Sequence, residues 1–228
     1  MSTAPQDLTA ALDAIIAERS LLKHPFYQAW TEGTLPLEKM REYAKQYFHF
    51  EAAFPTFLSA LHSRCDSPAV RQSILENLWD EEYGPDNHVA LWLRFCEGLG
   101  LSEAEVRAGR PNAETQALVD GFRSACFTRP VAEGLAALYA YESQAPEIAR
   151  QKIDGLARNY GIRDERTLSF FKVHQEADVA HSGAEREAIA ACVRTESERE
   201  GVEEAARIAA DRLWLFLDGA YRDGAAHV

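Results

Sequence analysis

The sequence is short of the features that mark disulfide-rich, zinc-binding and membrane-spanning proteins. Its 228 residues include only four cysteines, Cys65, Cys96, Cys126 and Cys192, and no C-x-x-C pair. Because this spacing fits neither a zinc framework nor a disulfide scaffold, we expect buried, reduced thiols. No apolar run reaches the ~18 residues that a membrane-spanning helix needs. The sequence therefore predicts a protein that has no membrane-spanning helix.

Positive charge is also scarce. The chain carries 24 basic and 36 acidic residues, a formal net charge of −12 at pH 7. A field of that sign repels a phosphate backbone, so we expect no nucleic-acid partner. The first ten residues hold neither a basic nor an apolar segment, and we therefore expect no signal peptide, no membrane partner and a cytoplasmic location.

The alternation of apolar and polar residues that marks a half-buried strand does not persist anywhere. Apolar residues instead recur at helical spacing. We expect helices over residues 6–20, 25–32, 36–64, 68–83, 87–99, 112–127, 130–160, 164–193 and 198–222. Glycine (13) and proline (9) are sparse, and no linker is long enough to separate domains. The prediction is one all-α domain over residues 1–228, a bundle of seven or eight helices.

Two of the long expected helices contain an internal proline. Pro55 and Pro146 each remove a backbone hydrogen bond to the carbonyl four residues earlier, which bends a helix. For Pro146 that carbonyl belongs to Glu142. We therefore expect a kink beside this acid.

Polar side chains of the metal-binding type lie on apolar faces of the expected helices. Glu142 follows Val131 and Leu138 on one stripe, and His88 shares a face with Leu91. Either residue alone is explained as an ion-pair partner or a hydrogen-bonded core histidine. Both side chains are nevertheless predicted to point into the core.

The expected helix near residue 170 carries three such side chains on one stripe. Phe171, His174, Asp178 and His181 follow each other at positions i, i+3, i+7 and i+10. This set includes a His–Asp pair spaced by one helical turn. All three polar residues are candidate metal ligands.

The acidic triplet Asp80-Glu81-Glu82 closes another expected helix. Asp80 projects well away from the apolar face of that helix. Glu81 and Glu82 flank the centre of the face, and the pattern does not separate them. One of these two acids is a further candidate ligand.

Several inward carboxylates need compensation, because burying them without cations is costly. Inward lysines and arginines are scarce on these faces. Three carboxylates and three imidazoles match two divalent cations, and mixed nitrogen and oxygen ligands favour iron or manganese. The usual diiron bundle carries Glu-x-x-His pairs. The nearest match here is Asp178-x-x-His181, which indicates a different all-α scaffold.

Four segments carry a resemblance to a known family, and it extends over about residues 10–222. The segment HPFYQAWTEGTLPLEKMREYAKQYFHF (24–50) resembles the haem-oxygenase-like superfamily, which includes thiaminase-type and quinone-synthesis proteins. The segments DEEYGPDNH, YAYESQAPE and FFKVHQEADVAH resemble the dimetal oxidases of that superfamily. Among these oxidases the chain is most similar to the chlamydial protein associating with death domains and its bacterial relatives, which make para-aminobenzoate.

This resemblance implies a haem-oxygenase-like fold and a centre of two metals, either two irons or one iron and one manganese. It also implies O₂ as co-substrate, an external reductant and a homodimer. The implied ligands are Glu81, His88, Glu142, His174, Asp178 and His181.

The same resemblance implies that the protein consumes its own residues. Tyr27 would supply the aromatic product, Lys152 its amino nitrogen, and Tyr43 redox support. A tyrosine ring with its Cβ has the seven carbons of para-aminobenzoate. From the sequence alone, Tyr27 and Tyr43 are ordinary core or rim aromatics, and Lys152 is a lysine that snorkels from the edge of an apolar face.

Other functions remain open at this point. A related dimetal oxidase could act on an external fatty acid or amine, and a cofactorless oxidase is disfavoured by the three acids. The chain could also be a non-catalytic interaction protein. A thiaminase-like hydrolase would need an activated cysteine, and nothing around Cys126 activates it.

Overall fold

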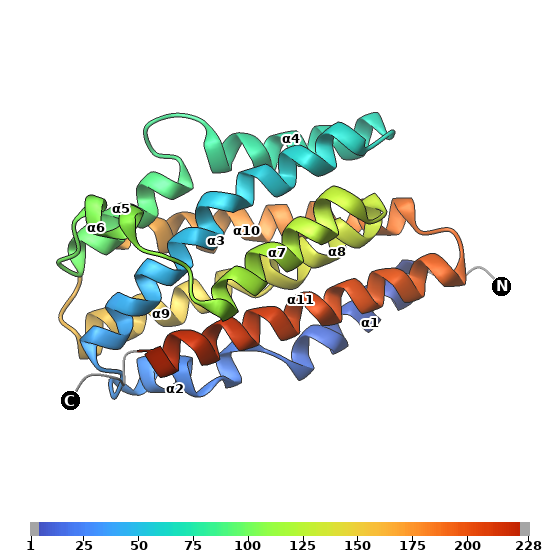
Figure 1. The fold of residues 1–228 in the computed structure, drawn as a ribbon. Coiled ribbons are helices and arrows are strands. Elements are labelled where there is room, and N and C mark those ends of the chain that lie inside the picture. Colours follow the sequence, from blue (N-terminus) through green and yellow to red (C-terminus); the bar gives the residue numbers. More distant parts are fainter. Residues whose placement is uncertain (1–4, 224–228) are drawn as a thin grey trace.

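The computed structural model describes residues 5–223, and within that range it is all-α (Figure 1). The described part holds eleven α-helices and one short 3-10 helix. They are α1 (Pro5–Glu18), η1 (Leu21–Lys23), α2 (Pro25–Glu32), α3 (Leu37–Arg64), α4 (Pro68–Glu82), α5 (His88–Gly98), α6 (Glu103–Ala108), α7 (Ala113–Thr128), α8 (Val131–Glu142), α9 (Ala145–Asn159), α10 (Glu165–Cys192) and α11 (Glu196–Asp223). The predicted all-α class is confirmed.

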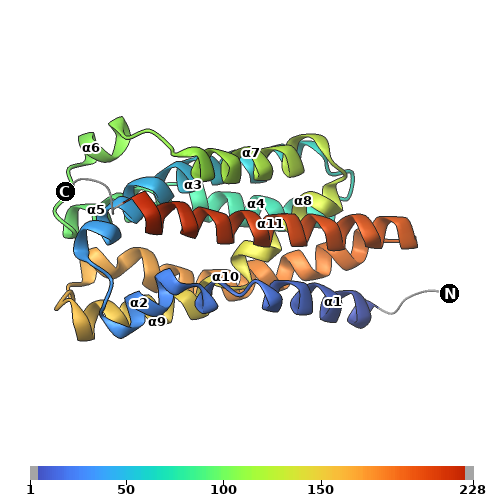
Figure 2. The same cartoon turned by 60° about the horizontal axis from the view of Figure 1, so that its bottom comes forward.

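The helices pack lengthwise around a continuous hydrophobic core. Helix α11 contacts α8, α7 and α1, and Figure 2 shows it running along the bundle between α7 and α1. Helix α10 contacts α8, α9 and α5, while α4 lies on the outer side of α3 (Figure 1). None of the helices within residues 5–223 combines the length and apolarity needed to cross a membrane.

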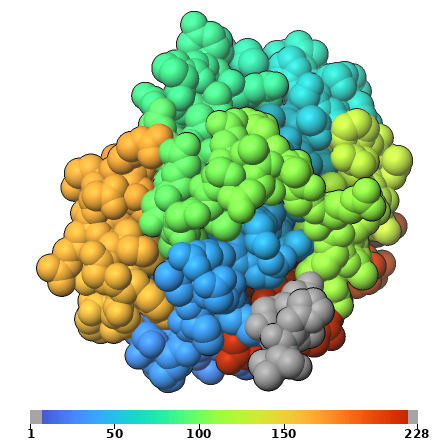
Figure 3. All heavy atoms as spheres, turned by 60° about the vertical axis from the view of Figure 1, so that its left-hand side comes forward, coloured from blue at the N-terminus to red at the C-terminus, as the bar shows by residue number. Residues whose placement is uncertain are grey.

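One short α-helix was not predicted from the sequence. Helix α6 begins with a capping box, in which the Ser102 side chain and the Glu105 backbone and carboxylate bond reciprocally. It packs against α3 and α5, and Figure 3 shows this segment lying over one end of the bundle. The helix closes that end.

The expected single helix over residues 130–160 is wrong, because the chain breaks between α8 and α9. Pro146 lies in the first turn of α9, where its missing N–H costs nothing. Ser143 and Gln144 form the junction, so Glu142 is the last residue of α8. Pro55, in contrast, lies inside an unbroken α3. This break and the additional α6 turn the nine expected helical spans into the eleven α-helices of the described chain, more than the seven or eight expected for the bundle.

Candidate metal centre

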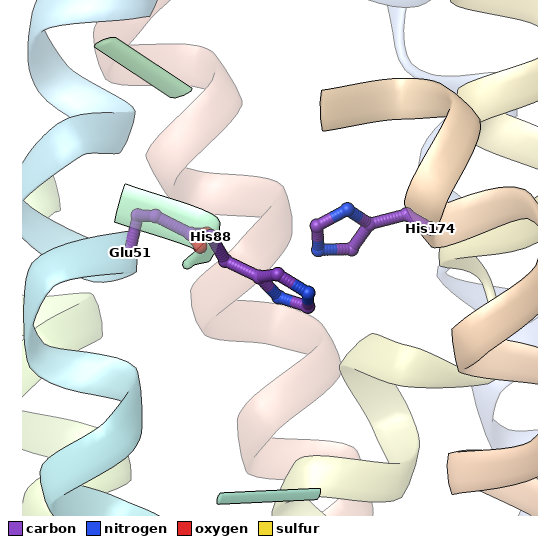
Figure 4. Close-up of side chains that lie close together, drawn as sticks. All are labelled: Glu51, His88 and His174. Atoms are coloured by element: carbon purple, nitrogen blue, oxygen red, sulfur yellow. The ribbon is translucent and has the colours of Figure 1, made fainter. Parts of the chain in front are cut away.

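The first of two ligand clusters consists of Glu51, His88 and His174, all buried, with one ligand atom of each within 4.8 Å of the others. Figure 4 shows them reaching from α3, α5 and α10, and the two imidazole centroids are 4.3 Å apart. His88 is the first residue of α5, which the Asn87 side chain caps. The Nδ1 atom of His174 is 2.7 Å from the Phe170 carbonyl oxygen, which leaves its Nε2 for a metal.

The second cluster consists of Glu142, Asp178 and His181, again with one ligand atom of each within 4.8 Å of the others. The Nδ1 atom of His181 lies 3.6 Å from an Asp178 oxygen and 3.8 Å from a Glu142 oxygen. Asn77 on α4 donates its amide to both Glu142 oxygens, at 2.9 and 3.2 Å. Glu142, the last residue of α8, is therefore held in place by a side chain of the neighbouring helix α4.

Glu81 lies between the two clusters. Its side chain is buried, and its Oε1 is 2.8 Å from Nδ1 of His88 in the first cluster. Burial raises the pKa of Glu81 well above its usual range, and the charges of Glu142 and Asp178 in the second cluster raise it further. Glu82 is exposed. The structure thus separates the two acids that the helical pattern left open.

Several buried polar atoms in this region have no hydrogen-bond partner among residues 5–223. They are Oε1 of Glu51, Oε2 of Glu81, both carboxylate oxygens of Asp178 and Nδ1 of His181. Leaving such atoms buried and unpaired costs free energy, and metal ligation would satisfy them. With Glu51 included, four carboxylates balance the charge of two divalent cations. The donor set therefore fits two metals of the iron or manganese type.

Glu51 was missed by the sequence analysis. It shares a helical stripe with Tyr43, Tyr47 and Phe54, at positions i, i+4, i+8 and i+11 of α3. This is the spacing that revealed Glu142 on another helix. An acidic residue on an otherwise aromatic stripe was therefore the signal in the sequence that could have identified Glu51 as a ligand.

Asp80 was predicted to project away from the core face of α4, and its side chain is half exposed, as expected. Its Oδ2 nevertheless lies 3.1 Å from Nε2 of His181. Metal-binding histidines commonly donate their second N–H to a carboxylate, which orients the ring. Asp80 can therefore orient the His181 ring so that its Nδ1 atom faces the second cluster. The Phe170 carbonyl oxygen can orient the His174 ring in the same way.

Changing Asp80 to alanine is expected to weaken binding of the second metal by about 10- to 100-fold, because His181 loses its orienting acceptor. The measurement is the iron content per chain after dialysis against a chelator, with a drop from two toward one expected. Glu82→Ala, an exposed acid two residues away, is the control. Equal metal content in both variants would mean that Asp80 does not orient the ligand.

A cavity of about 40 Å³ lies beside His174 of the first cluster, and most of its lining is apolar or aromatic. Tyr27, Tyr43 and Lys152 meet there. The hydroxyls of Tyr27 and Tyr43 are 3.2 Å apart, and Lys152 Nζ donates to Tyr43 at 2.7 Å. The same Nζ lies 5.1 Å from the centre of the Tyr27 ring. The expectation of a snorkelling lysine is wrong, because Lys152 is buried with its amine inside the bundle.

The contact between α2 and α9 brings these residues together. A Cβ at Gly155 would lie 2.8 Å from the Trp30 ring, so only glycine permits this approach. The Trp30 indole N–H then donates to the Lys152 carbonyl oxygen at 3.3 Å. Tyr27 and Lys152, which are 125 positions apart in the chain, become neighbours as a result.

Burial changes the protonation of this group. It lowers the pKa of Lys152 to about 7, although the charge of Glu51 opposes the shift. It raises the pKa of Tyr27 and of Tyr43 well above the ordinary value. Near neutral pH the site therefore holds two protonated phenols and an amine that is partly neutral.

Two further tyrosines link this cavity to the first cluster. The hydroxyls of Tyr47 and Tyr141 are hydrogen-bonded to each other, and the rings of Tyr43 and Tyr47 stack with centroids 5.7 Å apart. The Tyr47 hydroxyl also interacts with Glu51. Of Tyr43, Tyr47 and Tyr141, only Tyr43 was predicted from the sequence to have a functional role. Contacts between aromatic rings connect the first cluster with Tyr27.

The cysteines are free, as predicted, and three of the four are buried. Burial raises the pKa of Cys126 to about 12, so its reactive thiolate is scarce at neutral pH. This disfavours a thiaminase-like nucleophile.

The chain is similar to several known proteins. A family model described as "iron-containing redox enzyme" matches residues 41–214. A 4-aminobenzoate synthase of Nitrosomonas europaea is 45% identical over 226 residues, 95% of this chain and 92% of that protein. One of Chlamydia muridarum is 42% identical over 207 residues, 91% and 87% of the two chains. A Shewanella denitrificans domain with a haem-oxygenase-like fold superposes with a TM-score of 0.77 at 14% identity, covering 96% of this chain and 90% of that one.

Proposed function

Because this chain belongs to the iron-containing redox enzymes with a haem-oxygenase-like fold, we propose that it is a para-aminobenzoate synthase that consumes its own Tyr27. Membership of this family makes it an oxidoreductase-type enzyme. Relatives that are 42% and 45% identical to it over the aligned residues are 4-aminobenzoate synthases, which supports this product.

The metal ligands in this proposal are Glu81 and the members of the two clusters. Glu51, His88 and His174 would hold one ion, and Glu142, Asp178 and His181 the other, with Glu81 between them. The ions, two irons or one iron and one manganese, would supply O₂ activation, with electrons from an external reductant. The protein's contribution is to position the reacting side chains in a site with little water.

The observation that carries the proposal is the meeting of Tyr27, Tyr43 and Lys152 in a cavity of only about 40 Å³. Pockets for external small molecules usually measure about 300–1,000 Å³. This cavity is too small for a fatty acid, so the aromatic ring that already lies in it is the natural substrate. An external substrate could bind here only if this cavity widened.

The atoms of the product are all present in these side chains and O₂. The Cα–Cβ bond of Tyr27 breaks, and Cβ is oxidised to the carboxylate. The phenol C–O bond is replaced by a bond to Nζ of Lys152, and the phenol oxygen leaves as water. The Cε–Nζ bond breaks, and Cε is oxidised by two electrons to an aldehyde. One O₂ supplies both carboxylate oxygens, and Cα gains a hydrogen and becomes that of glycine. A second O₂ is reduced to water by the two electrons from Cε and two from the external reductant.

Each protein side chain has a distinct task in this scheme. Lys152 must present a neutral amine, and its burial favours that form. Tyr43 holds the Lys152 amine by a hydrogen bond beside the Tyr27 ring, and its own ring lies between Tyr27 and Tyr47. The surrounding apolar walls exclude water, which protects reactive species.

The nitrogen transfer is expected to depend on pH through Lys152. A buried lysine with a lowered pKa loses its proton as pH rises through about 7, so single-turnover product yield should rise between pH 6 and 8 and then level off. Following the side-chain nitrogen of Lys152 by ¹⁵N NMR, in protein labelled at lysine, gives an independent titration that needs no reagent to enter the cavity. Lys172, whose side chain is 42% exposed, is the internal reference. A Lys152 nitrogen that keeps the chemical shift of its charged form up to pH 9 would contradict the lowered pKa.

The direct test uses freshly purified protein that is loaded with ferrous iron without air and then given O₂ and reductant. Peptide masses covering Tyr27 and Lys152 are measured before and after, together with para-aminobenzoate. Loss of mass at residue 27 with a matching change at residue 152 is expected. Unchanged peptides with oxidised metals would overturn self-consumption and direct the search to an external substrate.

A further inference from the structure

A second cavity, of about 70 Å³, lies against the second ligand cluster, and the mechanism does not use it. It is bounded by α3, α4, α8 and α10, and His181 forms part of its wall. Its other polar lining residues are Ser73, Glu76, Asn77 and Glu185. We call this cavity the acidic vestibule. A space of this size accommodates an ion with one or two waters.

Two buried groups in the vestibule have unused oxygen atoms. Glu185 is only 5% exposed, its carboxyl group lies against that of Glu142, and neither of its oxygens has another hydrogen-bond partner within the described chain. Asn77 is 3% exposed and gives its amide hydrogens to Glu142, while its Oδ1 has no partner in residues 5–223. Buried unpaired oxygens are costly unless a ligand satisfies them. These oxygens can accept a cation.

The vestibule also connects water with the second cluster. Glu76 is exposed at its outer side, whereas Glu185 is buried one helical turn beyond His181 on α10. Two carboxylates with an amide and a hydroxyl oxygen are the donors that hard divalent ions such as Mn²⁺ prefer. Negative groups lining a cleft raise the local concentration of cations.

The cavity beside His174 offers no comparable route. Among the residues that line it there is no carboxylate, the only lysine or arginine is Lys152, and most of the others are apolar. A divalent cation approaching from that side would meet a partly protonated amine and low-dielectric walls, with no anionic oxygen to bind it. Compared with the cavity beside His174, the acidic vestibule is suited to cations.

We propose that the acidic vestibule is a transit site for divalent metal ions, in which Glu185 and Asn77 bind the incoming ion and pass it to Glu142, Asp178 and His181. This proposal rests on the proposed metal centre. It adds a third, weaker cation site outside the two clusters. It also assigns a function to Glu185, which is not needed as a ligand of either cluster.

The test follows Mn²⁺ uptake by the metal-free full-length protein, using the loss of the free-ion electron paramagnetic resonance signal after rapid mixing. Glu185→Gln keeps the shape of the side chain and removes the carboxylate that would bind the cation. Uptake of the ion destined for the second cluster is expected to slow by about 10-fold, with the same two ions bound tightly at equilibrium. A third, weak equivalent seen in the unchanged protein should disappear. Glu187→Gln, an exposed acid on the same helix, should behave like the unchanged protein.

A second variant covers the case in which Glu185→Gln does not fold. Glu76→Lys places a positive charge at the exposed side of the vestibule, where folding is not at risk. It should slow uptake without changing the final metal content, whereas Glu187→Lys should not. Unaltered uptake in both Glu185→Gln and Glu76→Lys would overturn the proposal. Loss of the second ion at equilibrium in Glu185→Gln would also overturn it, because Glu185 would then be a ligand or hold Glu142 in place.

Failure of the transit site can be told apart from failure of the proposed function. His181→Ala disrupts the second cluster but leaves Glu185 and Asn77 in place, so the weak Mn²⁺ equivalent should persist in this variant. Metal uptake that depends on Glu185, without any formation of para-aminobenzoate, would refute only the proposed reaction. Product formation with uptake that is independent of Glu185 would refute only the transit site.

Discussion

Tyr27→Phe is expected to reduce para-aminobenzoate to below about one hundredth of the unchanged protein's yield while both metals remain bound. Phenylalanine preserves the packing of the buried ring and removes only the hydroxyl that lies 3.2 Å from Tyr43. Without the phenol C–O bond there is no position at which nitrogen can replace oxygen. The measurement is product by mass spectrometry after a single exposure to O₂ and reductant, with iron content determined on the same sample.

The matched control is Tyr139→Phe. Tyr139 is also buried, but its hydroxyl is hydrogen-bonded to Asp13 and Arg186. It does not line the cavity beside His174 in which Tyr27 lies. Product yield should be retained in this control. Protein grown on ring-labelled tyrosine adds a positive test, because its product should carry the label even in a large excess of unlabelled free tyrosine. Full product from Tyr27→Phe would exclude Tyr27 as the source of the ring.

Glu142→Ala is expected to remove the second metal and reduce product by a similar factor. Glu142 belongs to the second cluster and accepts a hydrogen bond from the Asn77 amide on α4. Removing one ligand leaves a partial set, and O₂ activation needs both ions in the proposed scheme. Iron content should fall from two toward one per chain.

Glu147→Ala tests whether the loss is specific, since this exposed acid lies five residues later on α9. It should retain both metals and the product. Tyr27 in Glu142→Ala should keep its full mass after exposure to O₂. A Glu142→Ala protein with complete metal content and product would show that the ligand assignment is wrong.

The sequence predicted the inward side chains because each lies on a periodic helical face. His174, Asp178 and His181 lie on one stripe of α10, and His88 and Glu142 follow the apolar spacing of their own helices. Helical periodicity reports which side of a helix faces the core. It gave these five residues without any knowledge of how the helices pack.

Periodicity does not report which helices meet, and the unpredicted features are of that kind. Glu51 lies on a stripe that is typical of an aromatic core. Only the packing of α5 against both α3 and α10 brings it to the two histidines. Asp80 points away from the core of its own helix and still contacts His181 on α10. The burial of Lys152 depends on the close approach of α2 and α9 at Gly155.

The burial of Tyr27 has a consequence for the lifetime of the protein. Its side chain is 6% exposed, so it is part of the core as well as the proposed substrate. Cleavage at Cα–Cβ would leave glycine at position 27, and deletions of a buried aromatic side chain typically cost about 3–5 kcal/mol. Domains have a total stability of only about 5–15 kcal/mol. A spent molecule would therefore unfold more often than a fresh one and be degraded first, so that the reaction itself would mark used copies for replacement.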